Sequence, residues 1–259
     1  MQKLITFFIL AFLLSWCIWL PQYAHVFGAH ISIRLPFNHA IGGLGPMLAA
    51  FIVTAIYDKE KLGDLFAGMF RVGNIVMLLV ALCAPFLLAL LAIFIDGLLT
   101  GHYESPAVLL RSGEFPEWSF LTFALYNIIF FGFGEEVGWR GLALPELQKR
   151  FRPLMASVIL TVFWAVWHWP LFLYRPGYVA MGLPGIAGWV FSLLTGSMIL
   201  TWLFNNSRQS ILVCAIFHAT IDIAFLAGHT NNNISGYMGF LITVWGVIIA
   251  YRLNKKAIT

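Results

Sequence analysis

Long apolar runs alternate with short polar, glycine- or proline-containing breaks along almost the whole chain. A helix that crosses a membrane needs about 20 mostly apolar residues. The pattern predicts an all-α fold, a polytopic membrane helical bundle with about eight transmembrane helices, in a single integral-membrane domain over residues 1–259. The eight predicted helices cover residues 4–24, 40–57, 74–100, 118–141, 154–173, 185–204, 210–228 and 236–252.

The basic residues between these runs predict how the bundle is oriented. Short cytoplasmic loops are enriched in Lys and Arg, and an even number of crossings puts both ends of the chain on one side. If both termini are cytoplasmic, most of the basic residues fall inside and only Arg34, Arg111 and Arg175 fall outside. The inside set is Lys3, Lys59, Lys61, Arg71, Lys149, Arg150, Arg152, Arg208, Arg252, Lys255 and Lys256. We therefore expect both termini to be cytoplasmic.

Composition agrees with a protein whose main partner is the lipid bilayer. Apolar types make up 61% of the chain and charged types 10%, whereas soluble domains average about 25% charged residues. The net charge of +4 comes from short clusters rather than one basic face, so no nucleic-acid partner is predicted. Cys17, Cys83 and Cys214 lie in separate apolar runs and are expected to be buried small hydrophobic residues rather than disulfide or thiolate ligands.

Two connecting segments are expected on the outer side. The longest, residues 101–117, should lie along the membrane interface, and Asp96 just before it is expected at the interface too. The Gly- and Pro-rich segment 174–185 has the composition of a plain turn.

Charged and histidine side chains inside the apolar runs are few. Such groups are costly in a membrane, face the bundle interior and usually mark function. The set is Glu135, Glu136, Arg140, His168, His218 and Asp222. A rise of about 1.5 Å per residue from the nearest cytoplasmic charge or proline places Glu135, His168, His218 and Asp222 roughly 15 to 22 Å deep, so three helices bring polar groups to one level.

The stretch "EEVGWR" (135–140) divides its charges between two helix faces. Glu136 and Arg140 are spaced i, i+4 and can form an ion pair. Glu135 is rotated by about 100° from its neighbour, which leaves it free to act as a general base on water. The glycines 134, 138 and 141 are interpreted as positions where the backbone bends or approaches a substrate strand closely.

His218 and Asp222 also share one helix face, so the carboxylate could orient the imidazole or help to hold a substrate carbonyl. His168 comes from another helix. Taken singly, a buried Glu–Arg pair is usually structural, and an intramembrane histidine often only bridges helices. The joint pattern favours a site for attack of water on an amide.

Three motifs occur in order: "EEVGWR" (135–140), "WAVWH" (164–168) and "HATID" (218–222). Together they resemble the type II CAAX prenyl endopeptidase family, also called the CPBP or Abi family of intramembrane proteases. The resemblance implies a catalytic core over about 118–228.

That resemblance also implies a role for each motif residue. Glu135 would activate water with the aid of His168, while His218 and the residue four positions later would support the oxyanion. Glu136 and Arg140 would hold the helix and the position of Glu135.

Two positions depart from the family's pattern. Trp164 stands where the family usually has Phe, which changes packing volume. Asp222 stands where the better-known eukaryotic members carry Asn. An ionised Asp cannot donate a hydrogen bond to an oxyanion, so Asp222 would have to be protonated or act by orienting His218.

The leading hypothesis is an intramembrane endopeptidase that cleaves a membrane-associated peptide or protein, prenylated or not. It requires no cofactor, although two histidines and a glutamate also match a catalytic zinc set, with Glu135, His168 and His218 as ligands. The lack of a His-Glu-x-x-His arrangement favours the metal-free mechanism.

Two other functions are compatible with the same polar groups. One is a non-catalytic immunity or scaffold protein, and the other is an ion- or proton-coupled transporter, against which the lack of an internal repeat counts. The compact loops look prokaryotic, so we expect an integral protein of a bacterial plasma membrane.

Overall fold

The computed structural model describes residues 1–32, 35–229, 231 and 233–255. Arg34 and Lys256, both used in the orientation argument, lie outside the described residues. Helices and turns make up the described chain, which contains no β-strand, only an isolated bridge between Ser112 and Ala227. The predicted all-α bundle is confirmed.

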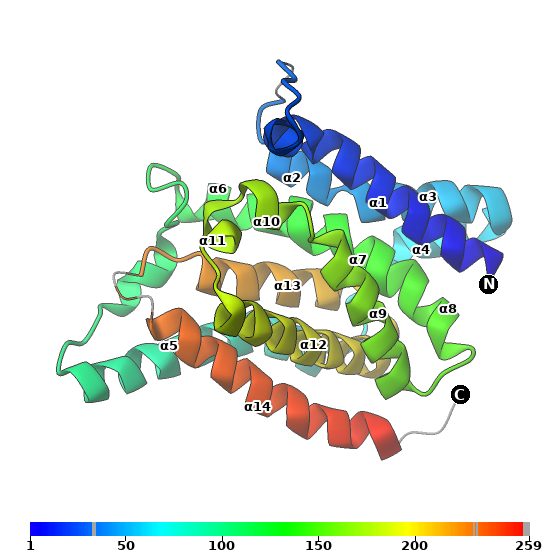
Figure 1. Ribbon diagram of the computed structural model, residues 1–259. Coiled ribbons are helices and arrows are strands. Elements are labelled where there is room, and N and C mark those ends of the chain that lie inside the picture. The colour runs from blue at the N-terminus through cyan, green and yellow to red at the C-terminus, as the bar shows by residue number, and fades with distance from the viewer. Residues whose placement is uncertain (33–34, 230, 232, 256–259) are drawn as a thin grey trace.

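Within the described residues, seven helical segments are long and apolar enough to cross a membrane. They are Gln2–Phe27, Asn38–Tyr57, Ile75–Thr100, Phe120–Gln148, Pro153–Tyr174, Leu183–Asn206 and Asn233–Lys255. An eighth apolar helix, α13 (Ile211–Phe225), is shorter, with 15 residues. These eight segments correspond in order to the eight predicted ones. Figure 1 shows the start of α1 (Gln2–Tyr23) and the end of α14 (Asn233–Lys255) at the same end of the bundle.

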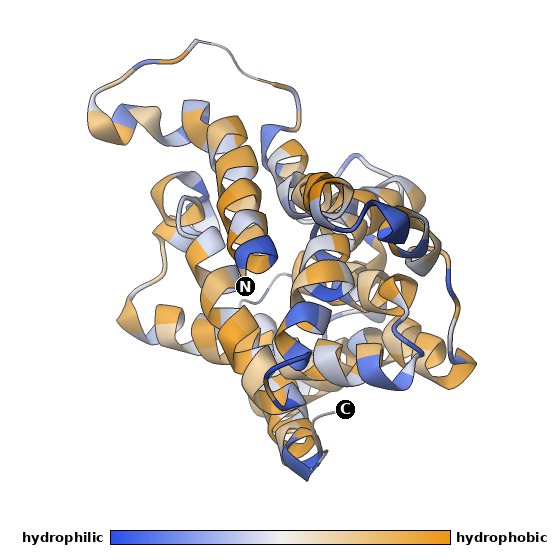
Figure 2. Ribbon diagram, turned by 90° about the vertical axis from the view of Figure 1, so that its right-hand side faces the viewer, coloured by the Kyte–Doolittle hydropathy of each residue, from blue (hydrophilic) through white to orange (hydrophobic). Residues whose placement is uncertain are grey.

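The long helices carry hydrophobic residues along most of their length (Figure 2). Many of these side chains are exposed on the outer surface of the bundle, for example Leu87 of α5 (Ile75–Thr100) and Phe240 of α14. An apolar outer surface on a bundle of this kind suits contact with lipid. The long helices besides α13 are α1 (Gln2–Tyr23), α3 (Gly45–Tyr57), α5 (Ile75–Thr100), α9 (Pro153–Trp167), α12 (Leu183–Asn206) and α14 (Asn233–Lys255).

Short helices connect the long ones. They are η1 (Ala24–Phe27), α2 (Asn38–Gly43), η2 (Lys59–Lys61), α4 (Leu62–Gly68), η3 (Pro106–Leu110), α10 (Leu171–Tyr174) and α11 (Pro176–Val179). The segment 174–185, expected to be a plain turn, therefore forms a helical turn of its own in α11.

The fourth crossing changes its helical pitch twice. It consists of α6 (Phe120–Tyr126), η4 (Asn127–Phe133), α7 (Gly134–Gly138), η5 (Trp139–Ala143) and α8 (Leu144–Gln148). Both η4 and η5 are π-helical, and π-helical turns frequently occur at functional sites. At the glycines where a bend was expected, the helix widens into π-helical turns. The crossing then continues to Gln148, beyond the predicted end at residue 141.

The glycines of this crossing contact neighbouring helices. A Cβ added to Gly132 would lie 2.5 Å from the Ala215 carbonyl oxygen, and one added to Gly138 would lie 2.6 Å from Pro46 Cβ. The backbone of α13 or α3 already occupies the space next to each of them. The interpretation of the flanking glycines as places for a substrate strand is therefore wrong for Gly138, because helix packing uses that surface.

Helix α13 lies in the middle of the bundle (Figure 1) and packs against α5, η4, α7 and α12. It begins at Ser210, whose hydroxyl accepts a hydrogen bond from the Val213 amide at 3.1 Å, a normal N-cap. After its last turn, the backbone pairs with the outer connection, where the Gly113 amide donates to the Leu226 carbonyl at 2.8 Å. Both ends of α13 are therefore held.

Two expectations about polar and small residues are wrong. Asp96 is buried, at 3% exposure, and both of its carboxylate oxygens accept hydrogen bonds from the Asn231 amide at 2.9 Å. The Asn231 side chain, rather than the membrane interface, therefore supplies hydrogen bonds to the Asp96 carboxylate. Cys214 is buried as expected, but Cys17 and Cys83 are exposed on the outer surface, because their helices turn those faces outward.

Gly138→Ala is expected to lower the free energy of unfolding by about 1–3 kcal/mol, the usual cost of overpacking a tight contact. The added methyl group would meet Pro46, including its backbone. Denaturant unfolding of the protein in detergent measures the change. The matched control is Gly63→Ala, because a Cβ at this helical glycine has no atom within 4 Å. Equal stability of the two variants would contradict this account of the helix contact.

Candidate active site

A cavity of about 880 Å³ lies between α7, α9, α12, α13 and the start of α14. Four of the six candidate residues line it: Glu135, His168, His218 and Asp222. The remainder of its wall is mostly apolar and aromatic. Its lining includes Trp19, Phe131, Trp164, Trp167, Tyr178, Trp189, Phe191, Phe217, Phe225 and Phe240.

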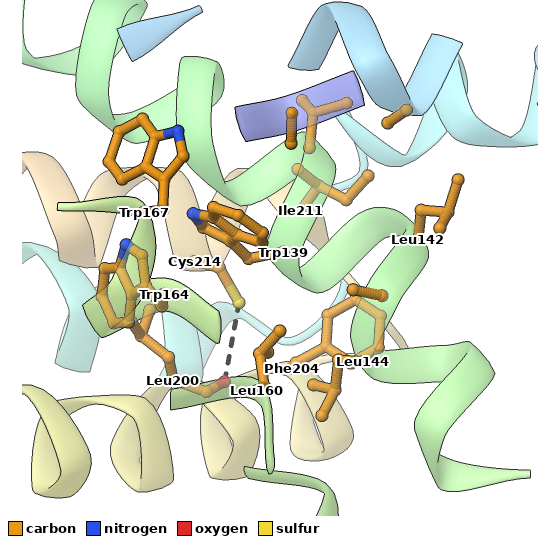
Figure 3. Close-up of a cluster of buried hydrophobic side chains, with 14 of the residues drawn as sticks. Trp139, Leu142, Leu144, Leu160, Trp164, Trp167, Leu200, Phe204, Ile211 and Cys214 are labelled. Atoms are coloured by element: carbon orange, nitrogen blue, oxygen red, sulfur yellow. Dashed lines mark hydrogen bonds between the residues drawn. The ribbon is translucent and has the colours of Figure 1, made fainter. Parts of the chain in front are cut away.

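Glu135 is held by two tryptophans. Its Oε2 accepts hydrogen bonds from the indole nitrogens of Trp164 at 2.7 Å and Trp139 at 3.3 Å. Within the described residues, no hydrogen bond reaches its Oε1, and the side chain is 3% exposed, in the cavity wall. Figure 3 shows the indoles of Trp139 and Trp164 in one cluster of buried side chains, beside Cys214. One carboxylate oxygen is fixed and the other is available.

Glu136 and Arg140 form the ion pair that their spacing predicts. Arg140 Nη1 donates to Glu136 Oε1 at 2.9 Å, and both side chains are fully buried. The same oxygen lies 2.7 Å from Nδ1 of His218 on α13. A carboxylate oxygen can only accept when ionised, so the imidazole donates from Nδ1. Glu136 therefore fixes the ring orientation of His218, a link that the sequence does not reveal.

Arg140 extends this network to two other helices. Its Nη2 donates to Ser197 Oγ of α12 at 3.1 Å, and Ser157 of α9 donates to the same hydroxyl at 3.3 Å. The guanidinium also lies over the Trp164 ring, 4.7 Å from the centroid, in a cation–π contact. Arg140 and Glu136 thus lie behind the cavity wall and connect four helical segments.

His168 follows the last turn of α9 and is 8% exposed, in the cavity wall. Its Nδ1 lies 2.7 Å from the Trp164 carbonyl oxygen. A carbonyl accepts, so Nδ1 carries the proton, and in the neutral ring Nε2 is the acceptor. The ring packs edge-to-face against Trp167 at 4.8 Å between centroids.

His218 and Asp222 lie on one face of α13, as their spacing predicts. His218 Nε2 is 3.5 Å from Asp222 Oδ2, so each ring nitrogen of His218 faces a carboxylate. Since the contact with Glu136 is shorter, Glu136 rather than Asp222 is the main orienting partner of the imidazole. Asp222 is partly exposed to the cavity, with 30% of its side chain accessible.

The zinc set considered from the sequence does not form in this arrangement. Among the described residues, no group of three or more His, Cys, Asp or Glu side chains converges as metal ligands do. Glu135 faces two indoles and His218 faces Glu136, so the three candidate ligands Glu135, His168 and His218 point to different partners.

Sequence reasoning missed the residues that support the site. The sequence pattern presents Trp164 only as packing volume and assigns no role to Trp139. Both donate to Glu135. Trp139 stands four residues after Glu135, at the spacing at which side chains on a helix meet, so an indole donor beside the proposed base could have been inferred. Ser197 lies 57 positions from its partner Arg140, which no local pattern indicates.

Comparison with known proteins supports the motif resemblance. The family model described as type II CAAX prenyl endopeptidase Rce1-like matches residues 117–224. Over this segment the chain is similar to the Rce1-like family. The segment contains all six candidate residues and runs from just before α6 to the last turn of α13.

A curated protein is similar to this one over nearly the whole chain. It is named CAAX prenyl protease 2, from Methanococcus maripaludis, and is 26% identical over 265 residues. The alignment covers 96% of this chain and 93% of the relative. The family and this relative together support a membrane protease of the CAAX prenyl protease type.

Arg140→Ala is expected to lower the free energy of unfolding by about 3–5 kcal/mol, since it leaves the Glu136 carboxylate buried without its cation. Denaturant unfolding in detergent measures the loss. Lys149→Ala is the control, because its ion pair with Glu146 is largely exposed on the lysine side and should contribute at most about 1 kcal/mol. A loss of the same small size in both variants would show that the buried pair does not hold the site together.

Proposed function

We propose that the chain is an intramembrane endopeptidase in which Glu135 activates water for attack on a peptide bond of a membrane-associated polypeptide. One observation carries this proposal: Glu135 has one oxygen fixed by two indole donors and its other oxygen unengaged in a cavity that also contains His168 and His218. A general base needs a fixed geometry and an available lone pair.

The first step is removal of a proton from water. Glu135 Oε1 accepts the proton while the water oxygen bonds to the carbonyl carbon of the substrate. His168 assists, because its Nδ1 proton is engaged by the Trp164 carbonyl and its Nε2 can accept a hydrogen bond from the same water. The two side chains together align one water lone pair with the carbonyl.

The second step places negative charge on the carbonyl oxygen. Donors that are already oriented stabilise such an oxyanion at little reorganisation cost. His218 is oriented by Glu136 through Nδ1 and directs Nε2 towards Asp222 and the cavity. We assign His218, with a proton on each ring nitrogen between the Glu136 and Asp222 carboxylates, to support of the oxyanion. Its Nε2 proton is the donor, and Asp222 holds that side of the ring.

The third step breaks the carbon–nitrogen bond. The oxyanion reforms a carbonyl, the leaving amine takes the proton that Glu135 accepted from water, and the new carboxyl group carries the water oxygen. Glu135 returns to its starting ionisation state, so the cycle consumes one water and one peptide bond. Glu136 and Arg140 take no part in the proton transfers and hold His218 and α7 in place.

The cavity supports an apolar, membrane-associated substrate. Its volume of about 880 Å³ falls in the usual range for pockets that enclose a ligand, and aromatic rings make up much of its wall. The relative's name points to a prenylated CAAX-type polypeptide as one substrate class, to be compared with non-prenylated apolar peptides. We place the protein in a bacterial plasma membrane with both termini cytoplasmic, on the compact loops and the distribution of basic residues.

Glu135→Gln is expected to reduce peptide cleavage by at least about 1000-fold, since an amide cannot accept the proton from water. The measurement is hydrolysis of prenylated and non-prenylated peptides by purified protein in proteoliposomes. Denaturant unfolding should give a stability close to that of the wild type, because Gln keeps an oxygen for the two indoles. Cleavage by Glu135→Gln at a near wild-type rate would exclude Glu135 as the base.

Cleavage is also expected to continue after exhaustive chelation, because the proposed mechanism draws on side chains of the protein and on no metal ion. Metal analysis of the purified protein, followed by activity measurements with and without chelator, tests this. Zinc bound in a one-to-one ratio, lost together with activity on chelation and restored with activity on adding zinc back, would contradict the metal-free mechanism.

A further inference from the structure

We propose that Tyr178 is a catalytic residue that donates a hydrogen bond from its hydroxyl to the oxyanion. This inference rests on the proposed function and adds a residue from outside the three motifs. It concerns the outer segment 174–185, which the sequence presents only as a turn.

The site needs such a donor. Asp222 is acceptor-only when ionised, and it stands at the position from which the family resemblance implies support of the oxyanion. His218 already uses Nδ1 for Glu136, at 2.7 Å. Only one ring nitrogen of His218 thus remains for the substrate, and it also faces Asp222 at 3.5 Å. A second donor with a free proton would complete the oxyanion site.

Tyr178 lies in the wall of the same cavity as Glu135 and Asp222. Its ring stacks nearly parallel to the imidazole of His168, with centroids 6.4 Å apart and an interplanar angle of 18°. Phe172 and Trp189 contact it edge-on, at 5.1 and 5.8 Å. Three aromatic neighbours therefore fix the direction of the phenol.

The hydroxyl is prepared to donate. The Trp189 indole packs edge-on against the Tyr178 ring and can only donate, so it does not compete for the Tyr178 proton. Burial raises the pKa of the Tyr178 phenol, and the carboxylates of Asp222 and Glu135 raise it further. The phenol therefore remains protonated, and its hydroxyl lies within electrostatic reach of both carboxylates.

A chain of contacts ties Tyr178 to the helix that carries His218. The Tyr178 amide donates to the Arg175 carbonyl at 3.0 Å, and the Arg175 guanidinium binds both oxygens of Glu114 at 2.8 and 3.0 Å. The residues just before Glu114 pair with the end of α13, where the Gly228 amide donates to the Arg111 carbonyl at 3.0 Å. Tyr178 and α13 are therefore positioned relative to one another by the outer connections.

Tyr178→Phe removes only the hydroxyl and keeps the ring contacts. It is expected to lower kcat by about 100-fold or more, the usual effect of losing one oxyanion donor, with KM changed less than about 3-fold. The matched control is Tyr174→Phe, whose hydroxyl faces His39 at 3.1 Å and does not line the cavity. Its kcat should stay within about 3-fold of the wild type.

Two further measurements separate catalysis from folding. Tyr178→Phe in the Glu135→Gln background should bind an uncleaved peptide as tightly as Glu135→Gln alone, and its unfolding midpoint should match the wild type. A kcat for Tyr178→Phe close to wild type, or a loss explained by weaker binding or stability, would overturn the role of Tyr178. In either case, a Glu135→Gln variant that does not cleave peptide would leave the proposed function intact. A Glu135→Gln variant that cleaves peptide would overturn the proposed function itself.

Glu114→Gln tests the positioning chain. The amide keeps one acceptor for Arg175 but loses the charge, so Tyr178 should be held less firmly and kcat should fall by about 10-fold, with little further loss in the Tyr178→Phe background. Such non-additivity marks two residues that act through one interaction. Fully additive losses would show that Glu114 does not act through Tyr178.

Discussion

The buried pair of Glu136 and Arg140 is the interaction on which the rest of the site depends. Removing each charge from water costs several kcal/mol, which good geometry and further hydrogen bonds must offset. Both side chains are fully buried, and Arg140 also contacts Ser197 and Trp164. The pair can exist only if α7, α9, α12 and α13 meet at this point. The same contact that satisfies Glu136 places His218 beside the cavity.

With Glu136 neutralised, Glu135 is the carboxylate of this stretch that faces the cavity. Two indole donors hold one oxygen of Glu135, and the two histidines of the cavity come from α9 and α13. The π-helical turns on either side of α7 and the close packing at Gly132 and Gly138 let this backbone approach α13 and α3. Close helix contact is what brings groups far apart in sequence within hydrogen-bond reach.

The outer connections belong to the site as well. Segment 101–117 pairs with the end of α13, Glu114 binds Arg175, and α11 brings Tyr178 against His168. Glu114, Arg175 and Tyr178 all line the apolar cavity. A site within a bundle of this size is therefore built jointly by its crossings and its loops.

The sequence by itself determined the all-α fold, the order of eight apolar helices and the pairing of Glu136 with Arg140, because hydrophobic runs and i, i+4 spacing are local properties of one helix. It also singled out Glu135, His168, His218 and Asp222, since polar groups are rare in such runs. Tertiary structure alone decided that Glu136 binds His218, that Asp96 is buried with Asn231, that the glycines serve helix packing, and that Tyr178 reaches the cavity. Each of these depends on which faces of distant segments meet, and that is set by packing across the whole bundle, which no local spacing records.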